Sequence, residues 1–226
     1  GEGCGMIVLK RLSDAQADGD NILALIRGSA VNHDGASGGL TVPNGLAQEA
    51  VIRQALAKSK VEASQVHYIE CHGTGTPLGD PIEVEALVNV YGKNRSQDIP
   101  IIISSVKTNI GHTEGAAGIA GLIKVILSLQ NEKIPPHLHL KQPNRRIAWE
   151  EIPIVVPTET RPWLRGAQAR LAGVSSFGLS GTNAHVIVEE APLITTVSDQ
   201  IERPWHLLTL SAKTEPALEE LVGKYE

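Results

Sequence analysis

Two histidines stand in turns whose composition suits catalysis. His72 opens the turn HGTGT (72–76), and His112 lies in a second polar turn that begins at Lys107. An imidazole can stabilise an oxyanion or move a proton near neutral pH. A third turn, 177–183, is rich in Gly and Ser and follows another predicted strand. Because ligands bind beyond the carboxyl ends of strands in α/β folds, we predict that the three turns form one site.

The same residues allow other interpretations. A single His in a Gly-rich turn is often only a structural hydrogen-bonding group. The turn 72–76 lacks the Gly-Lys-Ser/Thr ending of a P-loop and the spacing of a dinucleotide fingerprint, which disfavours nucleotide binding. His137 and His139 resemble a metal-binding pair, but the nearby prolines and the lack of a Cys or carboxylate cluster favour a surface strand. Cys71 adjoins His72, yet neighbouring strand residues point to opposite faces, so we expect a small buried hydrophobe there and not a nucleophile.

Alternating strand and helix patterns must position these turns. Runs rich in Val and Ile predict strands at 6–12, 22–32, 66–71, 99–106, 170–176 and 183–189, with a loop at 13–21. Helical spacing predicts helices at 45–59, 80–91 and 113–130. We expect Asn44 to cap the first helix and Asp80 to cap the second, with Pro81 at the first helical position.

The predicted helix at 113–130 starts with six small residues, Gly115, Ala116, Ala117, Gly118, Ala120 and Gly121. Each Gly costs up to about 1 kcal/mol of helix propensity, so we expect another backbone to pack closely against this helix. The helix is apolar on more than one face, which predicts a central-layer position. Beyond residue 190 the composition becomes polar: 191–206 is predicted to be a linker, and 207–225 a new element whose helix opens at Glu215-Pro216.

Composition limits the classes of protein and partner. The 226 residues carry a net charge of −5 with scattered Lys and Arg, so nucleic acid is an unexpected partner. Two cysteines are too few for a disulfide framework and fit a reducing compartment. No apolar run approaches the roughly 20 residues that span a bilayer. We therefore predict a cytoplasmic protein. The chain lacks a starting Met and runs at once into a predicted strand, so we expect it to begin inside a domain.

Three long motifs carry a family resemblance. They are ECHGTGTPLGDPIE (70–83), SSVKTNIGHTEGAAGIAGLIKV (104–125) and GVSSFGLSGTNAHVIVEEAP (173–192). In this order they resemble the second half of a β-ketoacyl synthase domain of a modular type I polyketide synthase. The resemblance covers residues 1–190 as the C-terminal half of that domain. Residues 191–226 resemble the linker and the start of the adaptor region that leads to an acyltransferase domain.

The resemblance implies an α/β, thiolase-like fold with layers αβαβα, of which this chain supplies mainly the second βαβαβαββ half. It implies catalytic roles for His72, His112 and Lys107 and a supporting role for Glu114. Phe177 matches a gating phenylalanine beside the nucleophile, and Thr74 and Thr76 match positions that line the phosphopantetheine channel. We expect Lys107 to hold the His112 turn through hydrogen bonds with Glu114 and its neighbours.

The implied reaction is a decarboxylative Claisen condensation between an acyl-Cys enzyme and a malonyl-type thioester on an acyl carrier protein. Two neutral imidazoles suit it, because they can donate N–H to the enolate oxygen without protonating the carbanion. The family's Cys nucleophile is expected upstream of residue 1, so residues 1–226 alone are expected to be inactive. No cofactor or metal is expected in this domain beyond the phosphopantetheine of the carrier. Expected partners are the first half of the domain, the carrier protein, an acyltransferase domain and a second copy of the full enzyme.

Two alternatives stay open at this point. A non-elongating ketosynthase would bind and pass on acyl chains, but such domains commonly lack the histidine at the position of His72. A decarboxylating loading ketosynthase would have its nucleophile replaced. A plain thiolase is disfavoured, because thiolases usually carry a second Cys near the C-terminus and none lies in 173–190.

Overall fold

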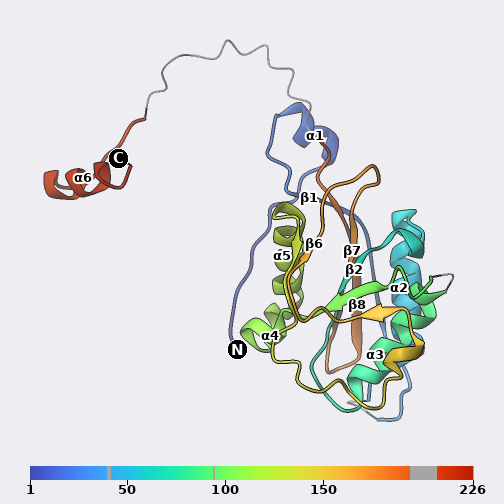
Figure 1. Ribbon diagram of the computed structural model, residues 1–226. Coiled ribbons are helices and arrows are strands. Elements are labelled where there is room, and N and C mark those ends of the chain that lie inside the picture. Colours follow the sequence, from blue (N-terminus) through green and yellow to red (C-terminus); the bar gives the residue numbers. More distant parts are fainter. Residues whose placement is uncertain (40–41, 94, 194–207, 226) are drawn as a thin grey trace. The chain divides into compact units, whose positions relative to one another are not determined.

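The computed structural model describes residues 1–39, 42–93, 95–193 and 208–225 (Figure 1). Residues Gly1–Pro192 form one unit and Leu193–Glu226 a second. The described part of the second unit contains the helix α6 (Glu215–Val222), which starts with Pro at its first turn as predicted. Most of the predicted linker, residues 194–206, lies outside the described residues. Within the described ranges, no helix is long and apolar enough to cross a membrane.

A mixed six-stranded sheet with the order β1-β8-β7-β2-β3-β5 forms the centre of the first unit. Its strands are β1 (Ala24–His33), β2 (Tyr68–Glu70), β3 (Ile101–Ser104), β5 (Ile154–Val155), β7 (Leu171–Phe177) and β8 (Thr182–Glu190). A separate two-stranded sheet pairs β4 (Lys133–Ile134) with β6 (Arg161–Pro162). Strands β7, β2, β3 and β5 are parallel neighbours, whereas β1 and β7 each run antiparallel to β8. Parallel pairing brings the carboxyl ends of β2, β3 and β7 to one edge of the sheet.

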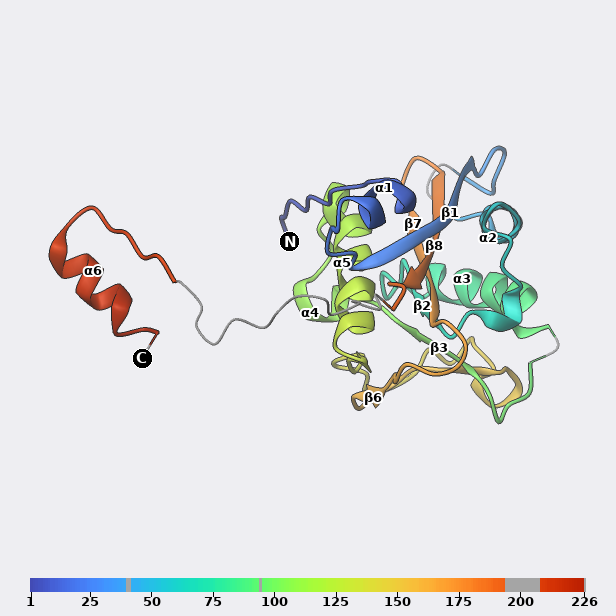
Figure 2. The same cartoon turned by 90° about the horizontal axis from the view of Figure 1, so that it is seen from above.

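Helices cover both faces of this sheet. The long helices are α2 (Gly45–Ser59), α3 (Gly79–Leu87) and α5 (Ala117–Gln130). Ile69 of β2 packs in the cluster that contains residues of α2 and α3, and its neighbour Tyr68 packs in the cluster that contains residues of α5. Figure 2 shows α5 on one side of the sheet and α2 with α3 on the other. The unit therefore has three layers, α, β and α, because alternate strand residues face opposite sides.

The shorter helical segments are α1 (Leu12–Ala17), α4 (Lys107–Ile110), the 3-10 turns η1 (Ala63–Gln65), η3 (Glu114–Ala116) and η4 (Trp149–Glu151), and the π-helical segment η2 (Val88–Gly92). Several boundaries confirm the sequence predictions. Helix α2 has the predicted bounds, and the Asn44 side chain accepts hydrogen bonds from the N–H groups of Leu46 and Ala47. The predicted pair of strands near the end of the first unit is the antiparallel hairpin β7–β8.

The predicted cap of the second helix is wrong. Leu78 occupies the position before α3, and the helix starts one residue before Asp80. The Asp80 carboxylate instead accepts a hydrogen bond from the Gly75 N–H at 3.0 Å, so it holds the preceding turn. The predicted end of this helix at residue 91 is confirmed within one residue, because the helical run continues past Leu87 through η2 to Gly92.

The predicted strand at 6–12 is also wrong. The described residues 1–11 contain no strand, and α1 occupies half of the predicted loop 13–21. Met6 and Val8 are 89% and 97% exposed. A strand exists through the hydrogen bonds that a neighbouring strand supplies, and this segment has no neighbouring strand among the described residues. The short apolar run at 6–9 is therefore left without a sheet.

Helix α5 uses its glycines on the side that faces its own sheet. A Cβ atom at Gly118 would lie 3.2 Å from the Ser176 Oγ, and one at Gly121 would lie 3.0 Å from the Glu70 Cγ. The close approach predicted for this helix is thus made by strands β7 and β2. On another face, Leu127 is 50% exposed, and a cavity of about 620 Å³ is lined by residues of α5 and by residues 2–5. The matching helix expected on that face stays a prediction.

Candidate active site

The sheet brings the three predicted turns together. His72 follows β2, α4 follows β3, and Phe177 is the last residue of β7. The ring centroids of His72 and His112 are 5.6 Å apart, with the rings nearly perpendicular at 82°. The ring of Phe177 is also 5.6 Å from that of His72. Side chains from all three strand ends therefore lie in contact range of one another, as expected for neighbouring parallel strands.

Backbone N–H groups fix the orientation of both imidazoles. The Phe177 N–H donates to His72 Nδ1 at 3.3 Å, and the Glu114 N–H donates to His112 Nδ1 at 2.9 Å. A neutral imidazole whose Nδ1 accepts a hydrogen bond carries its proton on Nε2. Glu114 reaches this position with φ of 49°, in the left-handed region that non-glycine residues seldom adopt. Each ring therefore presents an Nε2–H as a donor.

Both imidazoles are neutral at pH 7. Burial lowers the pKa of His72 from 6.5 to about 3, and the nearby Lys107 and His112 act in the same direction. The pKa of His112 is also lowered, by burial first and then by the charge of Lys107. Neutral donors can stabilise a developing oxyanion without giving up a proton to a carbanion.

Lys107 is placed differently from the prediction. Its Nζ donates to the main-chain oxygen of His72 at 2.5 Å, and the described contacts include none between Lys107 and the Glu114 carboxylate. Burial lowers the pKa of Lys107, whereas Glu83 and Glu70 raise it. The lysine therefore ties the His72 turn to α4, and Glu114 contributes its backbone N–H instead of its side chain.

Glu83 is a site residue that the sequence prediction missed. This buried carboxylate accepts the His72 N–H at 2.7 Å and the Gly73 N–H at 2.8 Å, one on each oxygen. Gly73 has φ of 46°, so the turn needs glycine at that position. Burial raises the pKa of Glu83 to about 7, although its two backbone hydrogen bonds lower it. The sequence signal that could have identified Glu83 is an acidic residue near the start of the helix that follows the His72 turn.

Thr74 and Thr76 are exposed residues of the same turn. The Thr76 Oγ1 accepts the Gly79 N–H at 2.9 Å, so this hydroxyl helps to begin α3. A cavity of about 440 Å³ lies beside the turn and is lined by Gly73, Gly75 and Glu83, among others. The channel role of the two threonines stays a prediction.

The other candidate groups are separate from the paired histidines. Cys71 is buried, as predicted, and burial together with Glu83 and Glu70 raises its thiol pKa well above the ordinary value, so the thiol stays protonated. His137 lies 3.5 Å from the Ser104 Oγ, and His139 is exposed. Within the described residues, no group of three His, Cys, Asp or Glu side chains could hold a metal ion.

Comparison with protein families gives two matches. Residues 23–141 match the model of the β-ketoacyl synthase C-terminal domain, and residues 143–226 match that of the ketoacyl-synthetase C-terminal extension. The chain is 48% identical to the phenolphthiocerol synthesis polyketide synthase type I Pks15/1 of Mycobacterium marinum (strain ATCC BAA-535 / M), over 99% of this chain and 11% of that protein. It is 50% identical to the erythronolide synthase EryA3 of Saccharopolyspora erythraea, over 99% of this chain and 7% of that protein. The chain thus spans a small part of these relatives.

Solved structures agree with the sequence relatives. A mutant of the ketosynthase from module 6 of the bacillaene synthase of Bacillus subtilis 168 has a TM-score of 0.81 at 40% identity, over 95% of this chain and 38% of that one. The oxazolomycin ketosynthase domain OzmH KS7 of Streptomyces albus JA3453 has a TM-score of 0.76 at 42% identity, over 81% of this chain and 32% of that one.

Proposed function

Because this chain belongs to the β-ketoacyl synthase family, we propose that its site carries out decarboxylative Claisen condensation in a polyketide synthase. The substrates are an acyl group bound as a thioester to an enzyme cysteine and a malonyl-type thioester on an acyl carrier protein. The observation that carries this proposal is the pairing of His72 with His112, 5.6 Å apart between ring centroids. Each ring has its Nδ1 occupied by a backbone N–H.

The reaction follows from that pairing. The malonyl carboxylate leaves as CO₂, and its C–C bonding electrons form an enolate of the thioester. The Nε2–H groups of His72 and His112 donate to the enolate oxygen, and a neutral pair does so without quenching the carbanion. The carbanion then attacks the acyl carbonyl carbon, and the cysteine thiolate leaves. The product is a β-ketoacyl thioester on the carrier protein, and the enzyme cysteine is free again.

We assign the nucleophile to a segment of the synthase other than residues 1–226. Cys71 is unsuitable, since its thiol is buried and its pKa is raised. Cys4 is exposed and lies in the segment before α1. Phe177, which contacts the His72 ring, is assigned the place beside that nucleophile. The polypeptide 1–226 by itself is accordingly proposed to be inactive.

Two side chains and one backbone N–H group position the reacting groups. Lys107 binds the His72 carbonyl, Glu83 binds the N–H groups of the His72 turn, and the Glu114 N–H binds His112. None of these contacts transfers a proton. Their effect is to hold the two Nε2–H donors in place, and exact placement of this kind accounts for a large part of catalytic rate.

The proposed partners follow from the polyketide synthase relatives. The carrier protein delivers its substrates on phosphopantetheine, for which Thr74 and Thr76 form part of the channel. Residues 191–226 lead toward an acyltransferase domain, which the match to a C-terminal extension of ketoacyl synthetases supports. The first half of the ketosynthase completes the five-layered fold, the full enzyme is a homodimer, and the protein is cytoplasmic.

The test uses a complete ketosynthase that contains residues 1–226 with a first half bearing the cysteine. It is loaded with an acyl thioester and given carrier-bound malonyl thioester labelled with ¹³C at the free carboxyl. Release of labelled CO₂ together with a longer β-ketoacyl product is expected. CO₂ release without chain extension would instead support a loading ketosynthase, and transfer of the acyl group without CO₂ release would support a non-elongating one. Either result would contradict the proposed condensation.

A further inference from the structure

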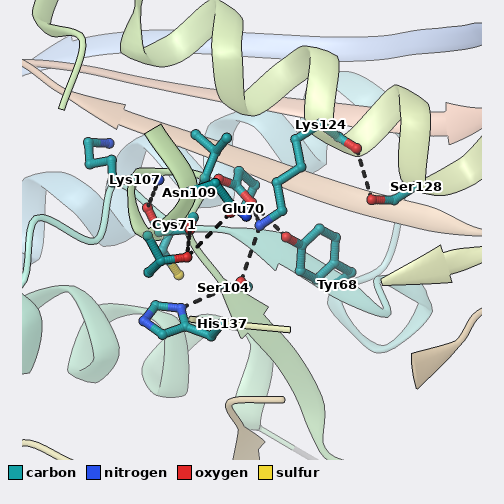
Figure 3. A network of polar contacts seen from close by, with 12 residues as sticks. Tyr68, Glu70, Cys71, Ser104, Lys107, Asn109, Lys124, Ser128 and His137 are labelled. Carbon is teal, nitrogen blue, oxygen red and sulfur yellow. Dashed lines mark hydrogen bonds and ion pairs between the residues drawn. The ribbon is translucent and has the colours of Figure 1, made fainter. Parts of the chain in front are cut away.

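A buried ionic network lies next to the reactive turns (Figure 3), and the hydrogen bonds described for it do not involve the rings of His72 and His112. The side chains of Glu70 and Lys124 are 1% and 9% exposed, and the Lys124 Nζ lies 2.8 Å from the Glu70 Oε2. The Tyr68 hydroxyl donates to the same carboxylate oxygen at 2.6 Å. The Lys124 Nζ also donates to the Ser104 Oγ at 3.1 Å. Both charged groups are thus buried and bonded to partners within the protein.

This network joins the end of β2, which leads to His72, the start of α4, which carries Lys107, and helix α5, which follows His112. Glu70 is the last residue of β2, close before His72. Its other oxygen, Oε1, accepts the Val106 N–H at 2.5 Å, directly before Lys107 and the start of α4. Lys124 belongs to α5, the helix that follows His112. One carboxylate therefore links the end of β2 to the start of α4, and one ammonium group holds that carboxylate from α5.

Stability alone is a poor explanation for an ion pair in this position. Taking two charges out of water costs about as much as their attraction returns, and replacement of buried pairs by apolar residues is often neutral or stabilising. The Glu70 side chain also requires glycine at position 121 of α5, since a Cβ atom there would lie 3.0 Å from the Glu70 Cγ. What an apolar pair could not supply is an acceptor for the Val106 N–H.

We propose that Glu70 and Lys124 are positioning residues for the condensation: Lys124 holds the Glu70 carboxylate against the Val106 N–H and thereby sets the start of the turn that carries Lys107 and His112. This inference rests on the proposed function, because the reacting groups are those assigned there. The pair acts through the backbone, so it governs the rate of carbon–carbon bond formation and not the binding of either substrate.

The test compares two double variants of the complete ketosynthase that carry the same charge. In Glu70→Leu/Lys124→Met the ion pair is replaced by apolar groups, and the Val106 N–H has no acceptor. In Glu70→Gln/Lys124→Met the charges are also gone, but the Gln carbonyl oxygen can accept that N–H. Acylation of the cysteine, kcat and KM for condensation, and hydrogen exchange of the peptide 105–113 are measured for each.

We expect the Leu/Met variant to lose about 100-fold in kcat, the cost of misplacing catalytic groups by about 1 Å, with KM and cysteine acylation unchanged. The Gln/Met variant should recover most of kcat. Amide exchange in 105–113 should rise in the first variant and stay at the wild-type rate in the second. Equal kcat and equal exchange in the two variants would overturn the proposal.

One further variant keeps the test decisive. If the Leu/Met variant does not fold, Glu70→Asp takes its place, because it keeps the charge and shortens the reach to Val106. Wild-type kcat and wild-type exchange in Glu70→Asp would overturn the proposal equally. A wild-type enzyme that fails to condense would refute the proposed function. Hydrogen exchange does not require activity, so it would still test whether Glu70 positions residues 105–113.

Discussion

The Nζ of Lys107 donates a hydrogen bond to the main-chain oxygen of His72, which joins the turn after β3 to the turn after β2. This contact places a positive charge beside two imidazoles, and that charge lowers the pKa of both. Lys107 is therefore an electrostatic neighbour of the histidines as well as a support for their turns.

Replacing Lys107 by Met should raise the pKa of His72 and of His112, since the like charge that disfavours their protonated forms is removed. Burial, the larger cause, remains, so the His72 pKa should stay below 6.5. Histidine-selective NMR titration of the ketosynthase measures both values. Lys107→Arg keeps the charge and should leave them nearly unchanged. Identical histidine pKa values in Lys107→Met and in the wild type would contradict this assignment.

Replacing Glu83 by Gln should lower kcat on the order of tenfold, because a single carbonyl oxygen cannot accept both the His72 and the Gly73 N–H and the lost bond costs about 1.4 kcal/mol. In the wild type, Glu83 gains a proton as pH falls through about 7, and the protonated carboxyl sets an O–H against one of those N–H groups. Wild-type kcat should thus decline below pH 7, whereas the Gln variant should show no such step. A step retained in the variant would assign it to another group.

His185 should make stability depend on pH. The ring is fully buried, lies 2.8 Å from the Tyr91 hydroxyl and 3.0 Å from the Ser175 Oγ, and burial lowers its pKa from 6.5 to about 3. As pH falls below 6.5, His185 becomes protonated in the unfolded chain but stays neutral in the folded chain. The free energy of unfolding therefore drops, by about 2 kcal/mol at pH 5.

The matched variant for this effect is His185→Gln, whose side chain does not titrate. It should be less stable than the wild type at pH 7.5, and the difference should shrink by about 2 kcal/mol at pH 5. Urea unfolding of both proteins at the two pH values measures the difference in their free energies of unfolding. Contributions from other titrating groups, such as Glu83, are the same in both proteins and cancel in that difference. A difference that does not change with pH would show that the folded protein protonates His185 normally.

The polypeptide 1–226 produced alone should associate. Met6, Val8 and Leu9 are 89%, 97% and 71% exposed, and Leu127 of α5 is 50% exposed. Apolar surface of this extent promotes contact between chains. Size-exclusion chromatography with light scattering should show species larger than a monomer, and Val8→Lys/Leu127→Lys should reduce them. A monodisperse wild-type monomer would contradict the prediction that these exposed apolar side chains cause association.

Much of the fold could be predicted because its signals are local. Asn44 before an apolar period predicts the start of α2, and two strand-like segments around a turn rich in Gly and Ser predict the β7–β8 hairpin. The α/β, thiolase-like fold class predicted from the resemblance is confirmed by ketosynthase structures with TM-scores of 0.76 and 0.81. The convergence of the three turns was also predictable, since parallel strands end at one edge.

The failures have two physical causes, which are dependence on distant partners and local backbone geometry that the residue types do not reveal. The short apolar run within 6–12 indicates a strand, but a strand needs a neighbouring strand to supply its hydrogen bonds. Lys107 was expected to form hydrogen bonds with Glu114 and its neighbours, whereas its Nζ donates to the main-chain oxygen of His72 and the Glu114 N–H donates to His112. Glu70 meets Lys124 only after the sheet and α5 have packed together.

The central claim is that His72 and His112 are neutral N–H donors to an enolate, and separate measurement of two half-reactions tests it most directly. His72→Ala and His112→Ala are placed in the complete ketosynthase, and cysteine acylation is measured apart from condensation. We predict that each variant acylates at the wild-type rate and condenses slower by about 10² to 10³, the usual cost of one oxyanion donor. Near-normal chain extension by His72→Ala, with acylation intact, would contradict the account.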